Sequence, residues 1–314
     1  MIGYSMRDLT KDYDYERLIR EEVEHYSEVE VTERLMLGGA HAHSSWDYYW
    51  QRVYETLLTS RYSDIARVLK EDHEGEAPIR ILSLASGYCG HELELAERLG
   101  TNYEITCTDV NPGIFARAKE VAKENALHLR FETVDLNFIK IAPETYDMIM
   151  AYASLHHVIN LEHLMDQISG GLKQHGFFHL VEVIGQNRKH MWDENEVFVN
   201  SLLRLLPESL VQTIVVQPSS EQDGMEGIRQ EEILPLLRQR FETLYEYLHG
   251  AFMRFICTHD DLGSALDPQD PFARRYLDFL IDVDVSAVKQ GILRPLEIWG
   301  TYRPIAPGDR GRGE

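Results

Sequence analysis

The turn at residues 85–90 has the residue types and spacing of a nucleotide-binding turn. It reads ASGYCG and joins the apolar run IRILSL to the helical stretch HELELAERLG. Gly87 lets a ligand approach the backbone closely, and Gly90 opens the following helix. The same residues fit the dinucleotide fingerprint with its first glycine replaced by Ala85, so the turn predicts a nucleotide-type cofactor.

An acidic residue follows at the distance from the turn that binding of a ribose requires. Asp109 ends the next apolar run, YEITCTD, about 20 residues after Gly87. A carboxylate at that position can accept hydrogen bonds from both ribose hydroxyls of an adenosine. Enzymes that use a nicotinamide dinucleotide and enzymes that use S-adenosylmethionine (SAM) both need such an acid, so these residues leave the choice of cofactor open.

These residues need strands that end side by side, and the pattern of the chain supplies them. From residue 79 to about residue 185, short apolar runs alternate with helical stretches, which predicts a mostly parallel sheet covered by helices on both faces. Two later runs, 241–250 and 295–304, predict an antiparallel pair at the edge of the sheet. The residues before the sheet read as helical, because apolar side chains recur at helical spacing in the stretch 44–71.

Three further features follow the turn and Asp109 in chain order. Asp135 ends the third strand in the run VDL, a Leu-His-His stretch follows the fourth strand, and GGLKQHG precedes the fifth. This series resembles the class I SAM-dependent methyltransferases over about residues 78–185. The resemblance implies an α/β fold with a Rossmann-like, doubly wound, mostly parallel seven-stranded sheet and an antiparallel edge strand. The chain departs from the family pattern at Ser83, Ala85 and Cys89, where the family has an acid and two glycines.

The resemblance also implies how the chain is organised. A looser likeness to uncharacterised bacterial methyltransferases of glycan or secondary-metabolite pathways rests on Gly185, Arg188 and Trp192, followed by the helix EILPLL. The expected parts are a helical lid at 1–76, a methyltransferase domain at 77–305 with a helical insertion at about 186–240, and a flexible tail at 306–314.

The resemblance places SAM at the carboxyl ends of the first strands. Asp109 would hold the ribose, while Asp135 and Leu136 would bind the adenine edge. Val110 or Asn111 would cover one adenine face. Each acid could instead bind local backbone amides, as a strand-end carboxylate does. The full set of expected cofactor contacts is Ala85, Ser86, Gly87, Gly90, Asp109, Val110, Asn111, Asp135, Leu136, Ala151 and Ala153.

Residues with chemistry of their own lie after the fourth and fifth strands. His156, His157 and Glu182 are the candidate catalytic groups, able to remove a proton where the acceptor has one to lose. One histidine of the pair could equally belong to the helix packing, and aromatic residues of the N-terminal segment could belong to the core. Two histidines alone do not define a metal site, so no metal is expected. The expected contacts to the acceptor are Arg188 and a roof made of His41, His43, Trp46, Tyr49 and Trp50.

The composition narrows the range of partners. The 314 residues carry a formal net charge of −21, which repels the phosphate backbone of a nucleic acid. The first residues do not read as a signal peptide, and no long apolar segment predicts a membrane span. Three scattered cysteines do not indicate a disulfide framework. We expect a cytoplasmic protein that binds neither nucleic acid nor membrane, with a homodimer as one open option.

These patterns favour methyl transfer from SAM to a small molecule in an enclosed pocket. Oxygen or nitrogen is expected as the target atom ahead of carbon, with S-adenosylhomocysteine (SAH) as the cofactor product. Two alternatives stay open. One is an NAD(P)-dependent oxidoreductase, because the glycine turn also fits a dinucleotide. The other is a catalytically inactive SAM-binding regulatory or partner protein, because of the departures at Ser83, Ala85 and Cys89.

Overall fold

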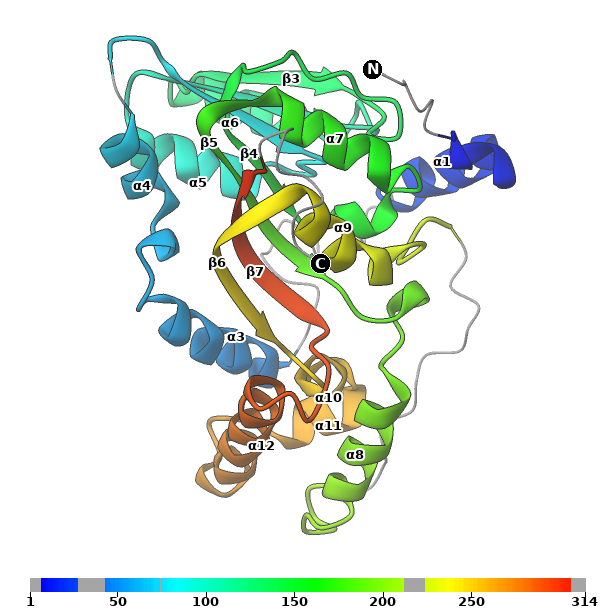
Figure 1. Ribbon diagram of the computed structural model, residues 1–314. Coiled ribbons are helices and arrows are strands. Elements are labelled where there is room, and N and C mark those ends of the chain that lie inside the picture. The colour runs from blue at the N-terminus through cyan, green and yellow to red at the C-terminus, as the bar shows by residue number, and fades with distance from the viewer. Residues whose placement is uncertain (1–6, 28–42, 74, 212–223, 306–314) are drawn as a thin grey trace.

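A seven-stranded sheet is the framework of the protein. The computed structural model describes residues 7–27, 43–73, 75–211 and 224–305. Strands β1 to β5 run parallel, while β7 runs antiparallel between β5 and the edge strand β6. The predicted fold class is therefore confirmed. Across the sheet the strands lie in the order β3-β2-β1-β4-β5-β7-β6 (Figure 1). Along the chain they are β1 Ile79–Leu84, β2 Tyr103–Asp109, β3 Leu129–Thr133, β4 Tyr146–Tyr152, β5 Leu172–Val183, β6 Phe241–His249 and β7 Glu297–Pro304.

The strand order reverses at β1, which places β1 and β4 side by side near the centre of the sheet. β1 pairs with β2 on one side and with β4 on the other, parallel to both. In a doubly wound sheet, ligands bind beyond the carboxyl ends of the strands at such a reversal. The turn after β1 and the loop after β4 therefore flank the expected binding crevice.

Helices cover both faces of the sheet. Successive side chains of a strand point to opposite faces, so Ile81 and Leu82 of β1 pack into two separate core clusters. Because both faces are buried, the central strands appear in the sequence as continuous apolar runs. The covering helices are α4 (Ile65–Asp72), α5 (Gly90–Leu99) and α6 (Ala116–Glu124) on one face, and α7 (Leu161–Gly171) and α9 (Ile233–Arg240) on the other.

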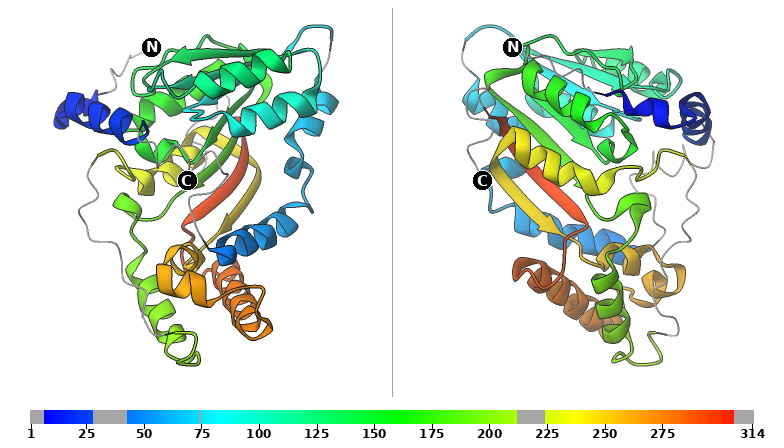
Figure 2. Two further views of the ribbon diagram at one scale, coloured as in Figure 1. Left: turned by 180° about the vertical axis from the view of Figure 1, so that it is seen from behind. Right: turned by 45° about the vertical axis from the view of Figure 1, so that its right-hand side comes forward.

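A second group of helices packs around the carboxyl end of β6 and the amino end of β7 (Figures 1 and 2). The predicted aromatic stripe lies on the buried side of the first of these helices, with Trp46, Tyr49 and Val53 in the core. The sequence does not indicate α10 and α11, because six residues are too few to show a helical period. The group consists of α3 (Ser44–Leu57), α8 (Asp193–Leu203), α10 (Met253–Thr258), α11 (Asp260–Ala265) and α12 (Pro271–Lys289).

The helices that precede β1 do not lie together. Helix α1 (Tyr15–His25) lies on the opposite side of the molecule from α3 and α4 (Figures 1 and 2). Among the described residues, none of the helices combines the length and the apolar character that crossing a membrane would need. The short 3-10 helices are η1 Leu9–Asp12, η2 Arg61–Ser63, η3 Leu155–His157, η4 Asn187–Lys189 and η5 Gln230–Glu232.

A buried acid connects the longest helix of the second group to its neighbour. Asp284 of α12 is fully buried, and its Oδ2 accepts hydrogen bonds from the backbone N–H groups of Phe252 and Met253 at 2.8 and 3.1 Å. These amides belong to the start of α10, whose first N–H groups have no partner within the helix. The Oδ1 atom has no hydrogen-bond partner. Burial raises the pKa of Asp284 to about 6, so the charged carboxylate lowers the stability of the folded protein.

We predict that Asp284→Asn stabilises the protein above pH 6. Below about pH 4, Asp284 is protonated in both the folded and the unfolded state and has no effect. Between pH 4 and 6 the unfolded state alone loses the proton, so stability falls by about 3 kcal/mol as the pH rises. Asparagine keeps an acceptor for the two amides without the charge. The variant's free energy of unfolding should therefore exceed that of the wild type by about 1–3 kcal/mol at pH 8 and by less at pH 5.

The measurement is chemical denaturation at pH 5 and pH 8. The matched control is Asp282→Asn on the same helix, because the Asp282 side chain is 68% exposed and its ion pair with Arg52 lies at the surface. A lower free energy of unfolding for Asp284→Asn than for the wild type at pH 8 would contradict the prediction.

Candidate active site

The turn after β1 is open to a ligand. Apart from the adjacent residues and the backbone of α5 itself, a Cβ atom placed on Gly87 or Gly90 would meet no protein atom within 4 Å, so the backbone there borders free space. Ala85, Gly87 and Cys89 all have positive φ angles of 46°, 53° and 61°, which fold the chain into a tight turn before α5. Ser86 fixes this turn to β2, because its Oγ accepts from the N–H of Thr108 at 3.2 Å. The predicted glycine turn therefore has the shape that a close ligand requires.

A buried carboxyl group is bonded to Ser83, the position where the family has an acid. Glu92 of α5 is buried, and its Oε1 accepts a hydrogen bond from Ser83 Oγ at 2.5 Å. Its Oε2 has no hydrogen-bond partner, and burial raises the pKa of Glu92 to about 7. An unpaired buried carboxyl oxygen fits an ammonium donor such as the amino group of SAM. The open turn and this oxygen together fit the cofactor that the sequence predicts.

Asp109 is placed at the turn as predicted, but it already binds two amides. Its Oδ2 accepts from the N–H of Gly87 at 3.0 Å, and its Oδ1 accepts from the N–H of Asn111 at 2.9 Å. Burial raises the pKa of Asp109, and the two amides oppose this effect. Each carboxylate oxygen has a second lone pair, so bonds to a ribose stay available. The ribose contact of Asp109 stays a prediction.

Asp135 is covered by the N-terminal helix. The hydroxyl of Tyr15 lies 2.9 and 2.8 Å from the two carboxylate oxygens of Asp135, and the N–H of Asn137 donates to Oδ1 at 2.9 Å. Burial and the Asp135 carboxylate raise the pKa of Tyr15. Tyr15 thus holds the acid that was expected to bind the adenine edge, and an adenine amino group would have to share it.

The other expected cofactor residues lie around the same strand ends. Asn111 donates from its amide to Ser27 Oγ at 3.0 Å, which connects the turn after β2 to the segment following α1. Leu136 and Ala151 are buried in the core, and Val110 is half-buried. Ala153 follows β4 with a φ of 46°, the same value as Ala85 after β1. These contacts with SAM also stay predictions.

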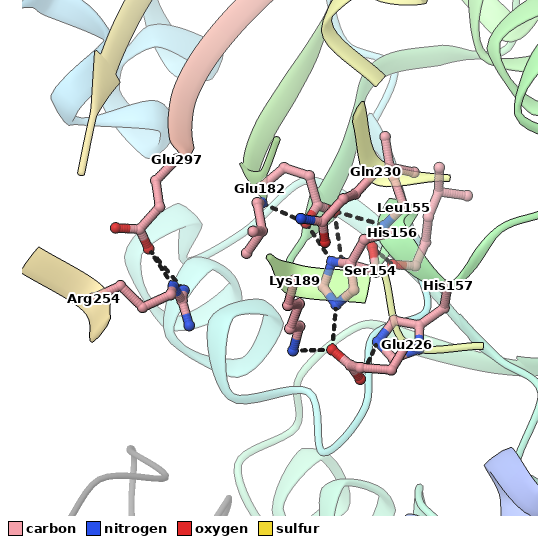
Figure 3. A network of polar contacts seen from close by, with 12 residues as sticks. Ser154, Leu155, His156, His157, Glu182, Lys189, Glu226, Gln230, Arg254 and Glu297 are labelled. Carbon is pink, nitrogen blue, oxygen red and sulfur yellow. Dashed lines mark hydrogen bonds and ion pairs between the residues drawn. The ribbon is translucent and has the colours of Figure 1, made fainter. Parts of the chain in front are cut away.

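Glu182 and His156 form a buried pair at the carboxyl ends of β5 and β4. The Nδ1 atom of His156 lies 2.5 Å from Glu182 Oε1 (Figure 3). Glu182 also accepts from the N–H groups of Ser154, Leu155 and Val183 at 2.8, 2.6 and 2.7 Å. Burial lowers the pKa of His156, against the opposing effect of Glu182. The imidazole is therefore neutral and fixed in orientation, as a general base must be.

A third carboxylate lies at the other nitrogen of this imidazole. Glu226 Oε1 is 3.2 Å from His156 Nε2, and Glu226 Oε2 is 3.4 Å from His157 Nε2. The Nδ1 atom of His157 lies 2.8 Å from Glu22 Oε1 of α1, close enough for a hydrogen bond but not aligned for one. Lys189 forms an ion pair with Glu226 Oε1. Figure 3 shows that both imidazole rings and the ammonium group of Lys189 point toward the Glu226 carboxylate.

A strained turn directs Lys189 into this cluster. Arg188 and Lys189 both have positive φ angles, 64° and 58°, which cost free energy in residues other than glycine. Arg188 was expected to bind the acceptor, but its Nη1 donates to the carbonyl oxygen of Gly224 at 2.7 Å. Burial lowers the pKa of Lys189 to about 8, so the amine is still largely protonated at pH 7. Arg188 therefore fixes the segment that carries Glu226, and Lys189 provides the charge.

The expected aromatic roof belongs mainly to the core of the second helix group. Tyr49 is fully buried, and its hydroxyl lies 3.0 Å from His249 Nδ1 and 3.2 Å from Glu297 Oε2. The guanidinium carbon of Arg254 lies over the ring of Trp46, 5.2 Å from the ring centre. Tyr49 is thus placed as a core residue, because its polar end is already bonded inside α3, β6 and β7.

The remaining residues of the expected roof differ in position. His41 lies outside the described residues. His43 precedes α3, and its Nε2 is 3.7 Å from Asp260 Oδ1 of α11. Trp50 is half-buried and packs edge-on against His249. The structure does not bring His43 together with His156, and the acceptor contacts of these residues stay predictions.

Four charged residues of the cluster and the turn were not expected from the sequence: Glu22, Glu92, Lys189 and Glu226. Glu22 and Glu226 reach the histidines from segments far away in the chain, so no local spacing reveals them. One signal was available, because glycines at 224 and 227 flank Glu226 and mark a tight turn.

Part of the chain is similar to a known protein family. Residues 81–176 match the family model described as "Methyltransferase domain". This match confirms the predicted methyltransferase domain over these residues. The dinucleotide oxidoreductase that the glycine turn left open is correspondingly disfavoured.

Curated proteins that are similar to this chain are much longer than it is. Trichosetin synthetase PKS-NRPS1 of Gibberella fujikuroi is 31% identical over 114 residues, which are 35% of this chain and 3% of that protein. Hybrid PKS-NRPS synthetase fsa1 of a Fusarium species is 29% identical over 162 residues, 48% of this chain and 4% of that protein. The chain thus spans only a few per cent of their length. Among solved structures, the CMeT domain of the citrinin polyketide synthase is 26% identical, with a TM-score of 0.35. The match covers 40% of this chain and 34% of that one.

We predict that Asp109→Ala weakens SAM binding by about 1–3 kcal/mol, because it removes acceptors for the ribose hydroxyls. Calorimetric titration with SAM measures the change. The matched control is Glu104→Gln near the amino end of the same strand, a half-exposed acid that pairs with Arg130 and should leave the affinity unchanged. An unaltered affinity in folded Asp109→Ala would restrict Asp109 to holding the turn.

Proposed function

We propose that this chain, whose residues 81–176 form a methyltransferase domain, transfers the methyl group of SAM to a small-molecule acceptor after His156 has removed a proton from that acceptor. The observation that carries this proposal is the buried His156–Glu182 pair. It lies at the carboxyl ends of β4 and β5, on the side of the sheet where the turn after β1 is open.

The pair has the properties of a positioned general base. Glu182 accepts a hydrogen bond from the Nδ1–H group of His156. The lone pair on Nε2 is then available to take a proton from the acceptor. Three backbone amides hold the Glu182 carboxylate, so the orientation of the imidazole is fixed before the acceptor binds. When bound at the turn, SAM would supply an electrophilic methyl group. The protein then has to hold the deprotonated acceptor atom in line with it.

A fixed base selects the kind of acceptor atom. A neutral amine can attack without first losing a proton, whereas a hydroxyl group or a carbon next to carbonyl groups must be deprotonated. The base therefore moves the expected target from nitrogen to oxygen or carbon. The similar curated proteins are named as polyketide-type synthetases, and polyketide chains contain carbons between two carbonyl groups. This likeness supports carbon as the target, with a β-keto thioester as the acceptor class.

Lys189 would stabilise the acceptor after it has lost its proton. Removing a proton from a carbon between carbonyl groups places negative charge on the oxygen atoms, and a partly buried ammonium group such as that of Lys189 stabilises such charge. Lys189 now pairs with Glu226, whose other contacts include His156 Nε2. Glu226 therefore has to move away before the acceptor reaches either group, and the acceptor oxygen would take its place at Lys189.

We predict that His156→Gln and Glu182→Gln each lower the rate of methyl transfer to a β-keto thioester by about 10²–10⁴-fold. SAM binding should stay unchanged in His156→Gln, because the base does not touch the cofactor turn. The assay is mass spectrometry of the methylated product at saturating SAM, with NMR to identify the methylated atom.

His175→Gln is the matched control, because His175 is exposed near the amino end of β5. Wild-type rates in both active-site variants would exclude His156 as the base. Product methylated only on oxygen would exclude the carbon target and leave the base in place.

A further inference from the structure

We propose that His156, His157 and Glu226 form a binding site for a divalent transition-metal ion of the zinc type. The inference shares His156 with the proposed function, but metal binding at these residues requires neither SAM nor an acceptor. One donor atom from each of the three residues lies within 4.8 Å of the others. Two imidazole nitrogens and one carboxylate oxygen are ligands that zinc prefers, whereas magnesium and calcium prefer oxygen alone.

The distances between the donor atoms match those around a small tetrahedral ion. Zinc lies about 2.0–2.2 Å from nitrogen and oxygen ligands, so neighbouring ligands of a tetrahedral site are about 3.3–3.5 Å apart. His156 Nε2 is 3.2 Å from Glu226 Oε1, and His157 Nε2 is 3.4 Å from Glu226 Oε2. The two distances end on different oxygens of Glu226, so each imidazole nitrogen lies at coordination-shell distance from one oxygen of the shared carboxylate, and one donor from each residue lies within 4.8 Å of the others.

Both histidines have a carboxylate behind them, as metal-binding histidines usually do. A second carboxylate fixes the ring and makes the metal-facing nitrogen more basic. Glu182 Oε1 lies 2.5 Å from His156 Nδ1, and Glu22 Oε1 lies 2.8 Å from His157 Nδ1, where a small rotation would align a hydrogen bond. In both residues the Nε2 atom then faces the Glu226 carboxylate (Figure 3).

The cluster contains more acceptors than cations. With the Nδ1 proton directed to Glu182, His156 presents a lone pair to Glu226, and an acceptor facing an acceptor is unfavourable unless a cation lies between them. His156 is buried and Glu226 is only 23% exposed, so water relieves this contact little. The ammonium group of Lys189 pairs with the same Glu226 oxygen. A metal ion bound to all three ligands would have to displace this ammonium group, so Lys189 competes with the ion.

Three protein ligands leave one position of a tetrahedral ion open for water or another small ligand. An ion on His156 Nε2 would occupy the lone pair that the general base uses. Metal binding and proton removal would therefore exclude each other, so the ion would act as an inhibitor of base-dependent methyl transfer.

The test is titration of untagged, chelator-treated full-length protein with Co²⁺, followed by the visible absorption of tetrahedral cobalt. We expect saturation at a single ion per chain. Glu226→Gln and His157→Gln should each weaken Co²⁺ binding by more than about tenfold, and Glu22→Gln by about 10–100-fold through the His157 ring. Lys189→Met should tighten binding, because it removes the competing cation.

His175→Gln and Glu231→Gln are the matched controls, since both side chains are exposed and lie outside the cluster. Circular dichroism and thermal unfolding of each variant show that its fold is intact. Absence of tetrahedral bands in both the wild type and Lys189→Met would overturn the site, as would bands that persist unchanged in Glu226→Gln and His157→Gln. Intact Co²⁺ binding in a protein that fails to bind SAM would overturn the proposed function alone.

Discussion

The buried carboxylate of Glu182 is the constraint on which the active site depends. A charge in the core is costly unless hydrogen bonds surround it, and Glu182 obtains them from three backbone amides and the His156 ring. Two of these amides, those of Ser154 and Leu155, belong to the loop after β4. The same carboxylate therefore shapes that loop and orients the imidazole, so the position of the base follows from the pairing of β4 with β5.

The second constraint is the closure of the strand ends by distant segments. Helix α1 reaches them through Tyr15 and Glu22, and the segment with Glu226 is attached by Arg188, whose Nη1 donates to Gly224. These contacts place the Tyr15 hydroxyl against Asp135, and the carboxylates of Glu22 and Glu226 against the histidines, where the cofactor and the acceptor are proposed to bind. The acidic groups and the ligands would occupy overlapping space. Binding therefore requires the distant segments to adjust while the sheet stays unchanged.

The part of the site that lies on strands could be predicted from the sequence, and the part that lies on connecting segments could not. Asp109, His156 and Glu182 follow from the alternation of buried strands and helices, because parallel strands end at one edge of the sheet. The position of Lys189 depends on two successive residues with positive φ angles, and no residue type in that turn indicates such a backbone conformation. Tyr49 was expected at the ligand, but the sequence cannot tell an aromatic residue that faces a ligand from one that lies in a core. Here Tyr49 lies in the core, where His249 and Glu297 bind its hydroxyl.

A crystal structure of the protein with SAH would show whether the glycine turn and His156 serve one reaction. We expect SAH on the turn at residues 85–90, with its sulfur atom facing the His156 imidazole and no protein atom between them. SAH bound elsewhere, or a sulfur atom separated from His156 by the protein chain, would contradict this expectation.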